Sequence, residues 1–333
     1  GIECTVHHID FPRALSPIKH ISAARQVDKL VQELEPDLIN IHFSAALFTT
    51  MLGKKSNWPK SIGTIHGLGS PLISGWRKYA VSRAEKWSAE RANEIFVLTD
   101  DDKEYLSEKA AKANVSKLNS FGMGCDIDRF DPNSVSTETK QGLRSEYGIK
   151  EDDFVFIFIG RQTYFKGFDK VVLAFLNLEA HHKNIKLLLI GEKDRIHPSS
   201  RKPGFESQLT ASKNIIRVGW KENVQDFLSI SQVNVFPSER EGLPVNLMES
   251  LAMGVPVITS NSRGCREVVR HEVDGVILEN NNLSELTKEM ESLLEDKARL
   301  EKFSSAALEG RDRFSRKHFI LDQLEILGRY GSN

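Results

Sequence analysis

Cysteine is scarce in this chain of 333 residues, and long apolar runs are absent from it. Cys4, Cys125 and Cys265 are odd in number and scattered, so they predict neither a disulfide framework nor a metal site. We therefore expect a reducing, cytoplasmic environment. Because no run of about 18 apolar residues occurs, the sequence predicts no transmembrane helix. The formal net charge of −1 gives no overall argument for binding nucleic acid.

The composition is that of a globular protein, with 40% hydrophobic and 27% charged residues. The length exceeds that of one ordinary core, which predicts two domains. β-prone runs alternate with helical patterns, which predicts an α/β protein with parallel, doubly wound sheets. The expected strands are residues 2–9, 37–43, 61–66 and 94–98 in the first half, and 154–160, 186–191, 215–220, 233–237 and 255–260 in the second.

Residues 238–258 carry the strongest functional signal. The short apolar runs 233–237 and 255–260 flank a helical segment, as parallel strands do in an α/β sheet. Pro244 suits the first turn of that helix, because the N–H that proline lacks would have no partner there. Gly254 is expected to end the helix.

Two glutamates and a group of backbone donors are expected at the carboxyl edge of the sheet, where ligands of open α/β sheets bind. Glu241 falls in the loop and Glu249 on the helix, while free N–H groups near Leu243 and Val245 favour an anion such as phosphate. Carboxylates beside a phosphate site fit a nucleotide-sugar, because its sugar and its ribose both offer vicinal hydroxyls. Taken alone, two glutamates are equally typical of a solvated helix end.

The pattern around these glutamates resembles a known family. Glu241 and Glu249, with seven residues between them, match the E-x7-E signature of the retaining glycosyltransferases called "group 1" (glycosyltransferase family 4). Glu-Gly-Leu-Pro at 241–244, Glu-Ser-Leu-Ala-Met-Gly-Val-Pro-Val-Ile at 249–258 and residues 264–269 stand where that pattern expects them. The resemblance covers nearly the whole chain. It implies the GT-B fold, in which two Rossmann-like domains face each other across a cleft.

The resemblance also implies the domain limits. We expect an acceptor-side domain at residues 1–131, a linker at 132–150 and a nucleotide-sugar-binding domain at 151–314. The helix expected at 315–333 would pack back on the first domain.

Two cations directly after a buried strand suit a diphosphate. Arg161 and Lys166 follow the strand at 154–160, and the glycines Gly160 and Gly167 allow a close approach. In the family that this element resembles, the arginine and lysine neutralise the leaving diphosphate. A plain basic turn is the alternative interpretation.

The resemblance implies roles for further residues. Glu241 would grip sugar hydroxyls and Glu249 the ribose. His66, at a strand end before Gly67, would reach the donor sugar and the acceptor pocket; a histidine that caps a turn is the structural alternative. The other residues expected to contact the donor are Gly160, Val218, Gly219, Gly242, Leu243, Pro244, Val245 and Glu267.

We expect no metal ion and no cofactor. The acidic residues 100–102 follow Thr99 directly. A helix N-cap at Thr99 with carboxylates in the first turn explains this run better than a metal site, because the helix dipole favours negative charge there.

The implied reaction moves a hexosyl or N-acetylhexosaminyl group from a nucleotide-sugar, with UDP-sugars favoured, to a glycan hydroxyl with retention. Residues 237–242 and 263–267 resemble the bacterial branch that extends polyprenyl-diphosphate-linked sugars for surface polysaccharides. UDP-GalNAc, UDP-GlcNAc and UDP-galactose are typical donors of that branch. Two alternatives remain: a non-catalytic nucleotide-sugar-binding or scaffold protein, and a cytosolic transferase for a small soluble acceptor.

Family members usually begin with one more strand, a Gly-rich loop and a helix before the strand expected at 2–9. The sequence contains no such unit. We therefore expect the biological protein to extend upstream of Gly1. A chain without that unit would expose strand edges and is not expected to be a competent enzyme.

Residues 54–93 form a basic segment, with eight cations against two carboxylates, or +6. Trp58, Trp76, Tyr79 and Trp87 are interspersed among the cations. One interpretation is a face held to an anionic membrane surface, at the inner side of the cytoplasmic membrane. The other is a solvated helix face whose aromatic side chains lie partly in the core. No recognised nucleic-acid-binding motif accompanies the segment, so nucleic acid is not an expected partner.

Overall fold

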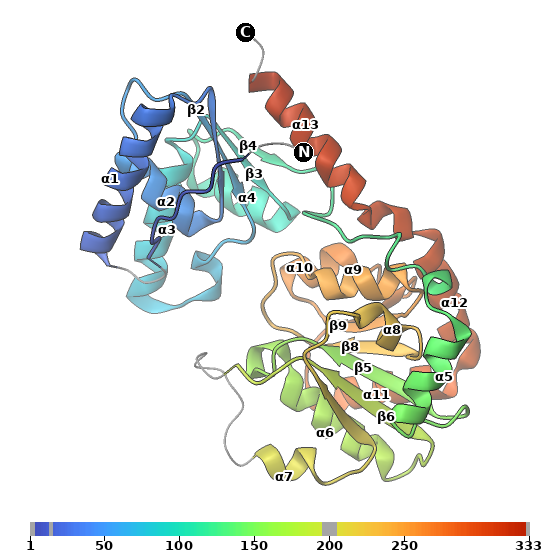
Figure 1. Ribbon diagram of the computed structural model, residues 1–333. Helices are drawn as coiled ribbons and strands as arrows, with labels where there is room; N and C mark the ends of the chain where they lie inside the picture. The colour runs from blue at the N-terminus through green and yellow to red at the C-terminus, as the bar shows by residue number, and fades with distance from the viewer. Residues whose placement is uncertain (1–3, 13–15, 195–204, 331–333) are drawn as a thin grey trace. The chain divides into compact units, whose positions relative to one another are not determined.

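The computed structural model describes residues 4–12, 16–194 and 205–330 of the chain. They form two compact units, one made of Gly1–Gly122 with Ile320–Asn333 and the other of Met123–Phe319. Each unit contains its own parallel sheet (Figure 1), as the alternation of strand and helix patterns predicted.

The first unit is built on a four-stranded parallel sheet with the order β1-β2-β3-β4. Its strands are β1 (Leu38–His42), β2 (Lys60–Ile65), β3 (Glu94–Val97) and β4 (Val115–Lys117). Its helices are α1 (Pro17–Leu34), α2 (Ser44–Gly53), the 3₁₀ helix η1 (Ser70–Leu72), α3 (Gly75–Ala89), α4 (Asp100–Lys109) and most of α13 (Arg316–Tyr330).

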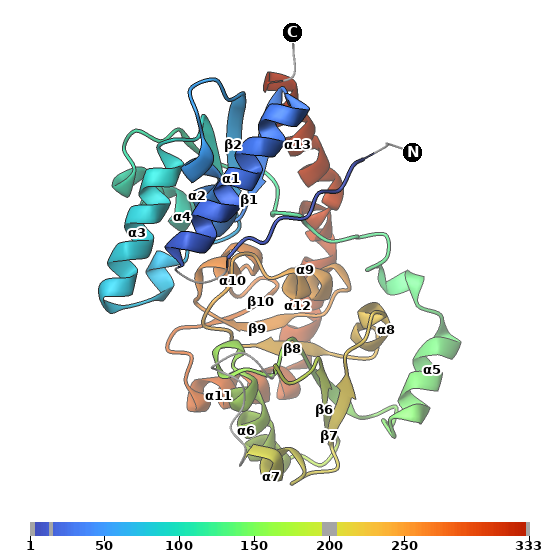
Figure 2. The ribbon, with the colours of Figure 1, turned by 60° about the vertical axis from the view of Figure 1, so that its left-hand side comes forward.

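The core of this unit lies where α2 and α4 cover the sheet. Ile65, Ile95 and Val97 on the inner strands are at most 1% exposed, as are Leu47 on α2 and Leu106 on α4. The strands β2 and β3 are buried along nearly their whole length, as strands of a parallel sheet covered on both faces are. α2 packs against both α1 and α3 (Figure 2).

The prediction of a strand at residues 2–9 is wrong for the residues that the structure describes. Residues 1–3 lie outside the described residues, and residues 4–9 form no strand. Their β-prone side chains are mostly exposed, with Val6 at 70%. β-propensity reflects how well a segment fits a paired, half-buried surface. Residues 4–9 pair with no described strand, so their β-prone composition alone does not place them in the sheet.

α13 completes the first unit. The Asp322 carboxylate accepts a hydrogen bond from the backbone N–H of Ser120 at 2.7 Å. Further along the helix, the Tyr330 hydroxyl donates to the Glu94 carboxylate at the start of β3, also at 2.7 Å. Glu94 is 4% exposed, so this contact satisfies a buried carboxylate.

The second unit contains a six-stranded parallel sheet with the order β10-β9-β8-β5-β6-β7. Its strands are β5 (Phe154–Ile159), β6 (Ile185–Ile190), β7 (Ile215–Gly219), β8 (Val233–Phe236), β9 (Val257–Ser260) and β10 (Gly275–Leu278). Its helices are α5 (Thr137–Glu146), α6 (Phe168–Glu179), α7 (Glu206–Leu209), α8 (Val224–Leu228), α9 (Val245–Ala252), α10 (Arg263–Val268), α11 (Leu283–Glu295) and α12 (Lys297–Glu309), with the 3₁₀ helices η2 (Pro132–Ser134), η3 (Tyr164–Lys166) and η5 (Arg311–Phe314).

The strand order of the second sheet reverses between β5 and β8. Strands β5, β6 and β7 proceed toward one edge, and β8, β9 and β10 return from β5 toward the other. Helices α6 and α11 lie against each other beside this sheet (Figure 1). A doubly wound sheet has a crevice at such a reversal, outside the carboxyl ends of its strands. The fold therefore points to the loops after β5 and β8.

The segment 132–150, which the sequence suggested as a linker, contains η2 and α5 and belongs to the second unit. Ser136 caps α5 by accepting a hydrogen bond from the Thr139 N–H at 3.2 Å. The helix buries no residue, so its sequence lacks the apolar stripe that identifies most helices. Among the described residues, no helix combines the length and the apolar character needed to cross a membrane.

Candidate active site

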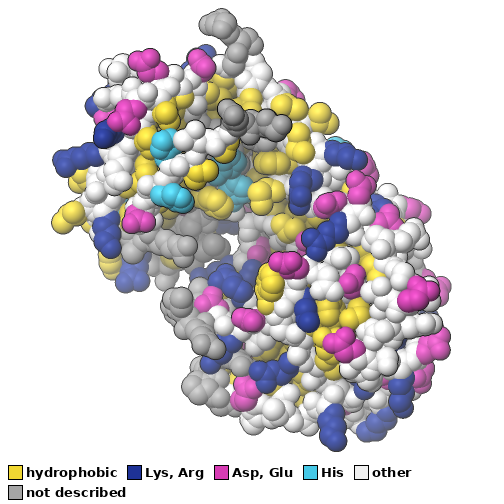
Figure 3. Space-filling view, viewed as in Figure 1, with side chains coloured by type: hydrophobic (Ala, Val, Ile, Leu, Met, Phe, Trp, Pro, Cys, Tyr) yellow, Lys and Arg dark blue, Asp and Glu magenta, His cyan; other side chains and the backbone are white. Residues whose placement is uncertain are grey.

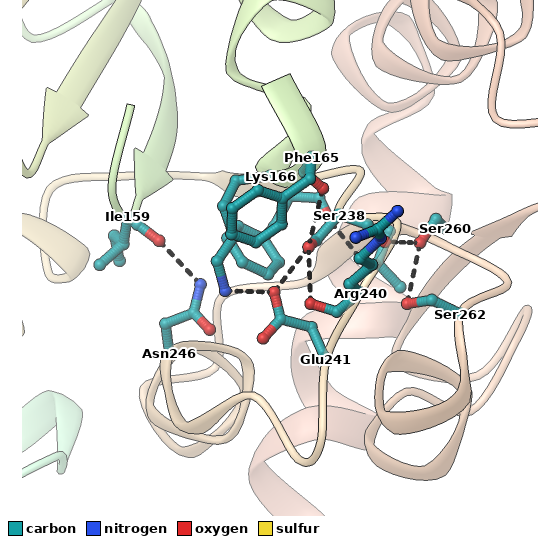
Figure 4. Close-up of polar contacts among 11 residues, drawn as sticks. Ile159, Phe165, Lys166, Ser238, Arg240, Glu241, Asn246, Ser260 and Ser262 are labelled. Carbon is teal, nitrogen blue, oxygen red and sulfur yellow. Dashed lines mark hydrogen bonds and ion pairs between the residues drawn. The ribbon is translucent and has the colours of Figure 1, made fainter. Parts of the chain in front are cut away.

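The carboxyl edge of the second sheet brings three loops together at the strand reversal. These loops follow β5, β8 and β9 and contain residues 160–163, 237–244 and 261–262. Figure 4 shows Lys166, Ser238 and Glu241 close together at this edge, with Ser262 from the loop after β9 nearby. The predicted strand–loop–helix order around Glu241 and Glu249 is confirmed, with α9 beginning at Val245.

An ion pair between Lys166 and Glu241 lies at the centre of this edge (Figure 4). The Lys166 Nζ atom is 2.5 Å from Oε1 of Glu241, and the Ser238 hydroxyl donates to the same oxygen at 2.6 Å. The two charged side chains are only 15% and 11% exposed. Charge-assisted contacts of this kind are strong when partly shielded from water, so both groups are held in place before any ligand binds.

Aromatic rings connect Lys166 to Arg161. The Lys166 ammonium lies 5.4 Å from the ring centroid of Phe165 and 5.3 Å from that of Phe236. The Arg161 guanidinium lies 5.8 Å from the same Phe165 ring. The two predicted diphosphate ligands therefore share one ring as a support, and each can make a cation–π contact with it.

Arg161 forms one side of a pocket of about 450 Å³. Its guanidinium pairs with Asp194 at 2.6 Å while 57% of the side chain stays exposed. The pocket is lined by Ile159, Gly160, Arg161, Ile190, Gly191, Glu192, Lys193, Asp194, Trp220, Lys221 and Val224. Pockets for small molecules and cofactors fall in this size range and combine apolar walls with a few polar groups.

The start of α9 is held in place by backbone contacts. Pro244 is the N-cap residue rather than the first helical residue, and α9 starts one position later. The Asn246 amide donates to the carbonyl of Ile159 at 2.9 Å, which ties the helix to the end of β5. A Cβ atom at Gly264 would lie 1.9 Å from the Gly242 carbonyl oxygen, so only glycine allows the start of α10 to contact the Glu241 loop.

Glu249 is a partly buried carboxyl group on α9. Burial raises its pKa to about 7, although Arg129 and Arg316 act in the opposite direction. The described residues provide no hydrogen bond or ion pair to its side chain. A carboxylate in such surroundings gains from a ligand that donates hydrogen bonds.

The remaining predicted donor residues are placed less closely together. Leu243 and Val245 are partly exposed on either side of Pro244, and Glu267 is partly exposed on α10. Val218 and Gly219 end β7, but neither lines the pocket; the adjacent Trp220 does, with 64% of its side chain exposed. Trp220, and not the predicted Val218 and Gly219, therefore lines the pocket at this edge.

His66 belongs to the first unit, at the carboxyl end of β2, as predicted. Its Nε2 atom lies 2.9 Å from Nδ1 of His42, and the ring of Phe43 stacks on it with centroids 4.5 Å apart. Burial lowers the pKa of both histidines, and His42 lowers that of His66 further. Figure 3 shows histidine side chains, in cyan, on the face of the first unit that is turned toward the viewer.

Sequence reasoning missed His42, Phe43, Ser238 and Asn246. A signal existed for His42, because the register places it opposite Thr64 at the end of the neighbouring strand. Side chains at the carboxyl ends of adjacent parallel strands meet at one edge. Phe43 has a φ of 75°, which is uncommon for a large side chain and had no sequence signal.

The acidic run after β3 serves a helix terminus. Thr99 accepts a hydrogen bond from the Asp102 N–H at 3.2 Å, which confirms the predicted N-cap, and Asp100 pairs with Lys117 at 2.5 Å. Within the described residues, one group has ligand atoms close enough for a metal ion, namely His182, Glu291 and Glu295. It is on the surface, and exposed acidic groups are common without an ion.

Comparison with known proteins gives the family. The model of the glycosyl transferases group 1 matches residues 139–310, and that of the glycosyl transferase 4-like domain matches residues 1–116. This chain belongs to the group 1 glycosyltransferases. The resemblance drawn from Glu241 and Glu249 is thereby confirmed, and glycosyltransferase is the enzyme class of the chain.

Individual relatives are distant but extend over most of the chain. UDP-Gal:alpha-D-GlcNAc-diphosphoundecaprenol alpha-1,3-galactosyltransferase of Escherichia coli is 23% identical, over 86% of this chain and 73% of the relative. The capsular polysaccharide biosynthesis glycosyltransferase CapM of Staphylococcus aureus is 24% identical, over 96% and 84%. Anabaena HepE in complex with UDP-glucose has a TM-score of 0.78 at 18% identity, over 92% of this chain and 82% of that chain. The last similarity, with the two parallel sheets, establishes the GT-B fold.

Proposed function

We propose that this glycosyltransferase moves a hexosyl or N-acetylhexosaminyl group from a UDP-sugar to a hydroxyl of a glycan carried on polyprenyl diphosphate, with retention at the anomeric carbon. The observation that carries the proposal is the Lys166–Glu241 ion pair with Arg161 beside it. A diphosphate needs cations, and sugar hydroxyls need an acceptor carboxylate. The site holds both kinds of charge at one sheet edge.

The donor would bind with its diphosphate against Arg161, Lys166 and the free N–H groups at the start of α9. Drawing Lys166 toward the phosphates releases the Glu241 carboxylate to accept hydrogen bonds from sugar hydroxyls. The ribose hydroxyls would satisfy Glu249, and the pocket beside Trp220 would take the base. The names of the E. coli relative and of the HepE complex support a uridine nucleotide.

Retention requires that the new bond form on the face from which the diphosphate leaves. The acceptor oxygen bonds to the anomeric carbon as the bond from that carbon to the diphosphate oxygen breaks. The hydroxyl proton passes to a phosphate oxygen of the leaving group. Arg161 and Lys166 stabilise the negative charge that grows there, and this electrostatic effect needs neither a protein nucleophile nor a metal ion.

A lipid-linked acceptor is supported by the E. coli relative, whose name specifies a diphosphoundecaprenol substrate. Catalysis would then take place at the inner face of the cytoplasmic membrane. His66 is the proposed contact to the sugar from the first unit, and its lowered pKa keeps the imidazole neutral near pH 7. A neutral ring can accept or donate a hydrogen bond to a hydroxyl.

The test is release of UDP from a panel of UDP-sugars, with and without membrane extract that contains lipid-linked acceptors. Glu241→Gln should lower acceptor-dependent turnover by about two to three decades. Glu239→Gln is the matched control, because Glu239 is exposed in the same loop and pairs with Lys170. Donor binding without turnover in the unmodified chain would favour a non-catalytic binding protein. Turnover with soluble acceptors alone would favour the cytosolic alternative.

A further inference from the structure

The outer side of α3 carries a row of large side chains that the core does not use. Trp76, Tyr79, Arg83 and Trp87 are spaced three or four residues apart and therefore lie on one side of the helix. Trp76 is 71% exposed, Tyr79 66% and Trp87 37%. The sequence left open whether these aromatic residues lie partly in the core, and the structure places the first two in solvent.

Every exposed charge on α3 is positive. Arg77, Lys78, Arg83 and Lys86 are exposed, whereas Glu85, the one carboxylate of the helix, is 4% exposed. Its Oε1 atom accepts hydrogen bonds from the backbone N–H groups of Gly69 at 2.7 Å and Ser70 at 3.4 Å. The inward position of Glu85 leaves a cationic outer surface, which we call the α3 face and define as Trp76–Tyr79, Arg83, Lys86 and Trp87.

Cations and rings alternate along the α3 face. The Arg77 guanidinium lies 5.8 Å from the Trp76 ring, and that of Arg83 lies 5.6 Å from the ring of Tyr79. The described residues provide no acidic partner for Arg77, Lys78 or Arg83. Trp87 extends the surface onto α2, where Phe48 meets its ring edge at 5.8 Å. Figure 2 shows α3 at the side of the first unit.

We infer that the α3 face binds the surface of an anionic phospholipid membrane. Tryptophan and tyrosine favour the boundary between lipid headgroups and acyl chains, and arginine and lysine beside them attract the anionic headgroups. A helix lying flat presents both kinds of side chain to that plane at once. The inference does not rest on the proposed reaction, because membrane binding requires neither the sugar donor nor the acceptor. Membrane binding would, however, bring the enzyme close to a lipid-linked acceptor.

The test is co-sedimentation of the full chain with vesicles of phosphatidylcholine, with and without phosphatidylglycerol. We expect binding to the anionic vesicles alone. Arg77→Gln/Lys78→Gln should lower the partition coefficient at low salt by about tenfold or more, at roughly one kilocalorie per mole for each charge. Trp76→Ser/Tyr79→Ser should lower it to a similar extent, because the apolar contribution is lost. These side chains are exposed, so circular dichroism should show an unchanged fold.

Lys103→Gln/Lys112→Gln is the matched control, since it removes two exposed charges of the same unit that are not part of the α3 face. This variant should bind vesicles as the unmodified chain does. An equal loss in this control, or no binding of the unmodified chain to anionic vesicles, would overturn the inference. The inference would also be overturned if a short nucleic acid duplex released the protein from the vesicles and its binding were lost in Arg77→Gln/Lys78→Gln.

Discussion

The Nδ1 atom of His42 lies 2.9 Å from the Nε2 atom of His66, so the two imidazoles share one hydrogen bond. One ring must donate and the other accept, so the tautomer of one ring determines that of the other. With Phe43 stacked on its face, His66 is held from two directions. Histidine at the end of β2 is therefore part of a small assembly rather than an isolated side chain.

His42→Phe should lower kcat/KM by about tenfold, since it removes one orienting hydrogen bond from His66. It also removes the neighbouring charge that lowers the pKa of His66. The acid limb of the activity profile should therefore move to higher pH. Rates measured as a function of pH, with His42→Gln as a variant that can restore the hydrogen bond, check this. An unchanged profile in His42→Phe would show that His42 does not act on His66.

Lys166→Met and Glu241→Gln should not be additive. The two groups are in direct contact, so either substitution alone leaves the other charge partly buried and unpaired. We expect the double variant to be more stable to denaturant than the sum of the single effects by about 1–3 kcal/mol. A complete double-mutant cycle of unfolding free energies measures the coupling. Coupling within experimental error of zero would mean that the pair is open in solution.

Donor binding should depend on pH through Glu249. Burial raises the pKa of this carboxyl group to about 7, so it is largely protonated at pH 6 and ionised at pH 8. Ribose hydroxyls bind the ionised form better. UDP affinity should therefore increase from pH 6 to pH 8 more in the unmodified chain than in Glu249→Gln. Calorimetric titration at both pH values separates this effect from the titration of UDP itself, which is common to both proteins.

The same raised pKa predicts a change in stability. The folded pKa of Glu249 lies above the ordinary value near 4.3, so the unfolded chain releases this proton first. The contribution of the group to stability is full below about pH 4 and is lost as pH rises toward 7. Glu249→Gln should therefore gain stability relative to the unmodified chain between these values. An equal difference at pH 4 and pH 8 would contradict the raised pKa.

Gly264→Ala should impair donor binding, because its Cβ atom would lie 1.9 Å from the Gly242 carbonyl oxygen and displace the Glu241 loop. We expect a loss of stability of about 1–3 kcal/mol as well. Gly142→Ala is the control: a Cβ at that position in α5 meets no atom within 4 Å, and alanine should stabilise the helix by roughly 0.5–1 kcal/mol. UDP titration and thermal unfolding of both variants measure the contrast.

Glu85→Ala should destabilise the first unit by about 1–3 kcal/mol, because it leaves the N–H groups of Gly69 and Ser70 without their acceptor. Glu104→Ala, which removes an exposed glutamate from α4, should change stability by less than about 0.5 kcal/mol. Chemical denaturation of the two variants provides the comparison. Equal effects would show that the Glu85 contacts contribute little.

Apolar runs made the strands of the second unit predictable. Residues 154–159 are a continuous hydrophobic segment, and residues 233–236 are apolar apart from Asn234, as is typical of strands in a sheet covered on both faces. The polar helix α5 was not predictable in the same way, because it contributes no buried stripe. The strand predicted at residues 2–9 was wrong for a different reason. A β-prone composition does not show whether the segment pairs with another strand.

Site residues were predictable where spacing determines position. The fold places Glu241 in a loop and Glu249 on the following helix, and the spacing between them already required this. The partner of Glu241 could not be predicted in this way. Lys166 contacts it from the 3₁₀ helix η3, 75 residues earlier in the chain. From the sequence, the two charged side chains were assigned to different parts of the ligand and not to each other. Such pairing depends on tertiary packing, which no local pattern records.

The assembly of the first unit from residues 4–122 and 320–330 sets an order for its synthesis. A ribosome produces the four strands of its sheet early, yet Tyr330 reaches the buried Glu94 carboxylate only after the entire second unit has been translated. Domains generally fold in the order in which they emerge. In this chain the second unit can fold before α13 is available to pack on the first unit. The first unit is therefore translated first and completed last, and the surface that α13 covers stays exposed while the second unit is translated.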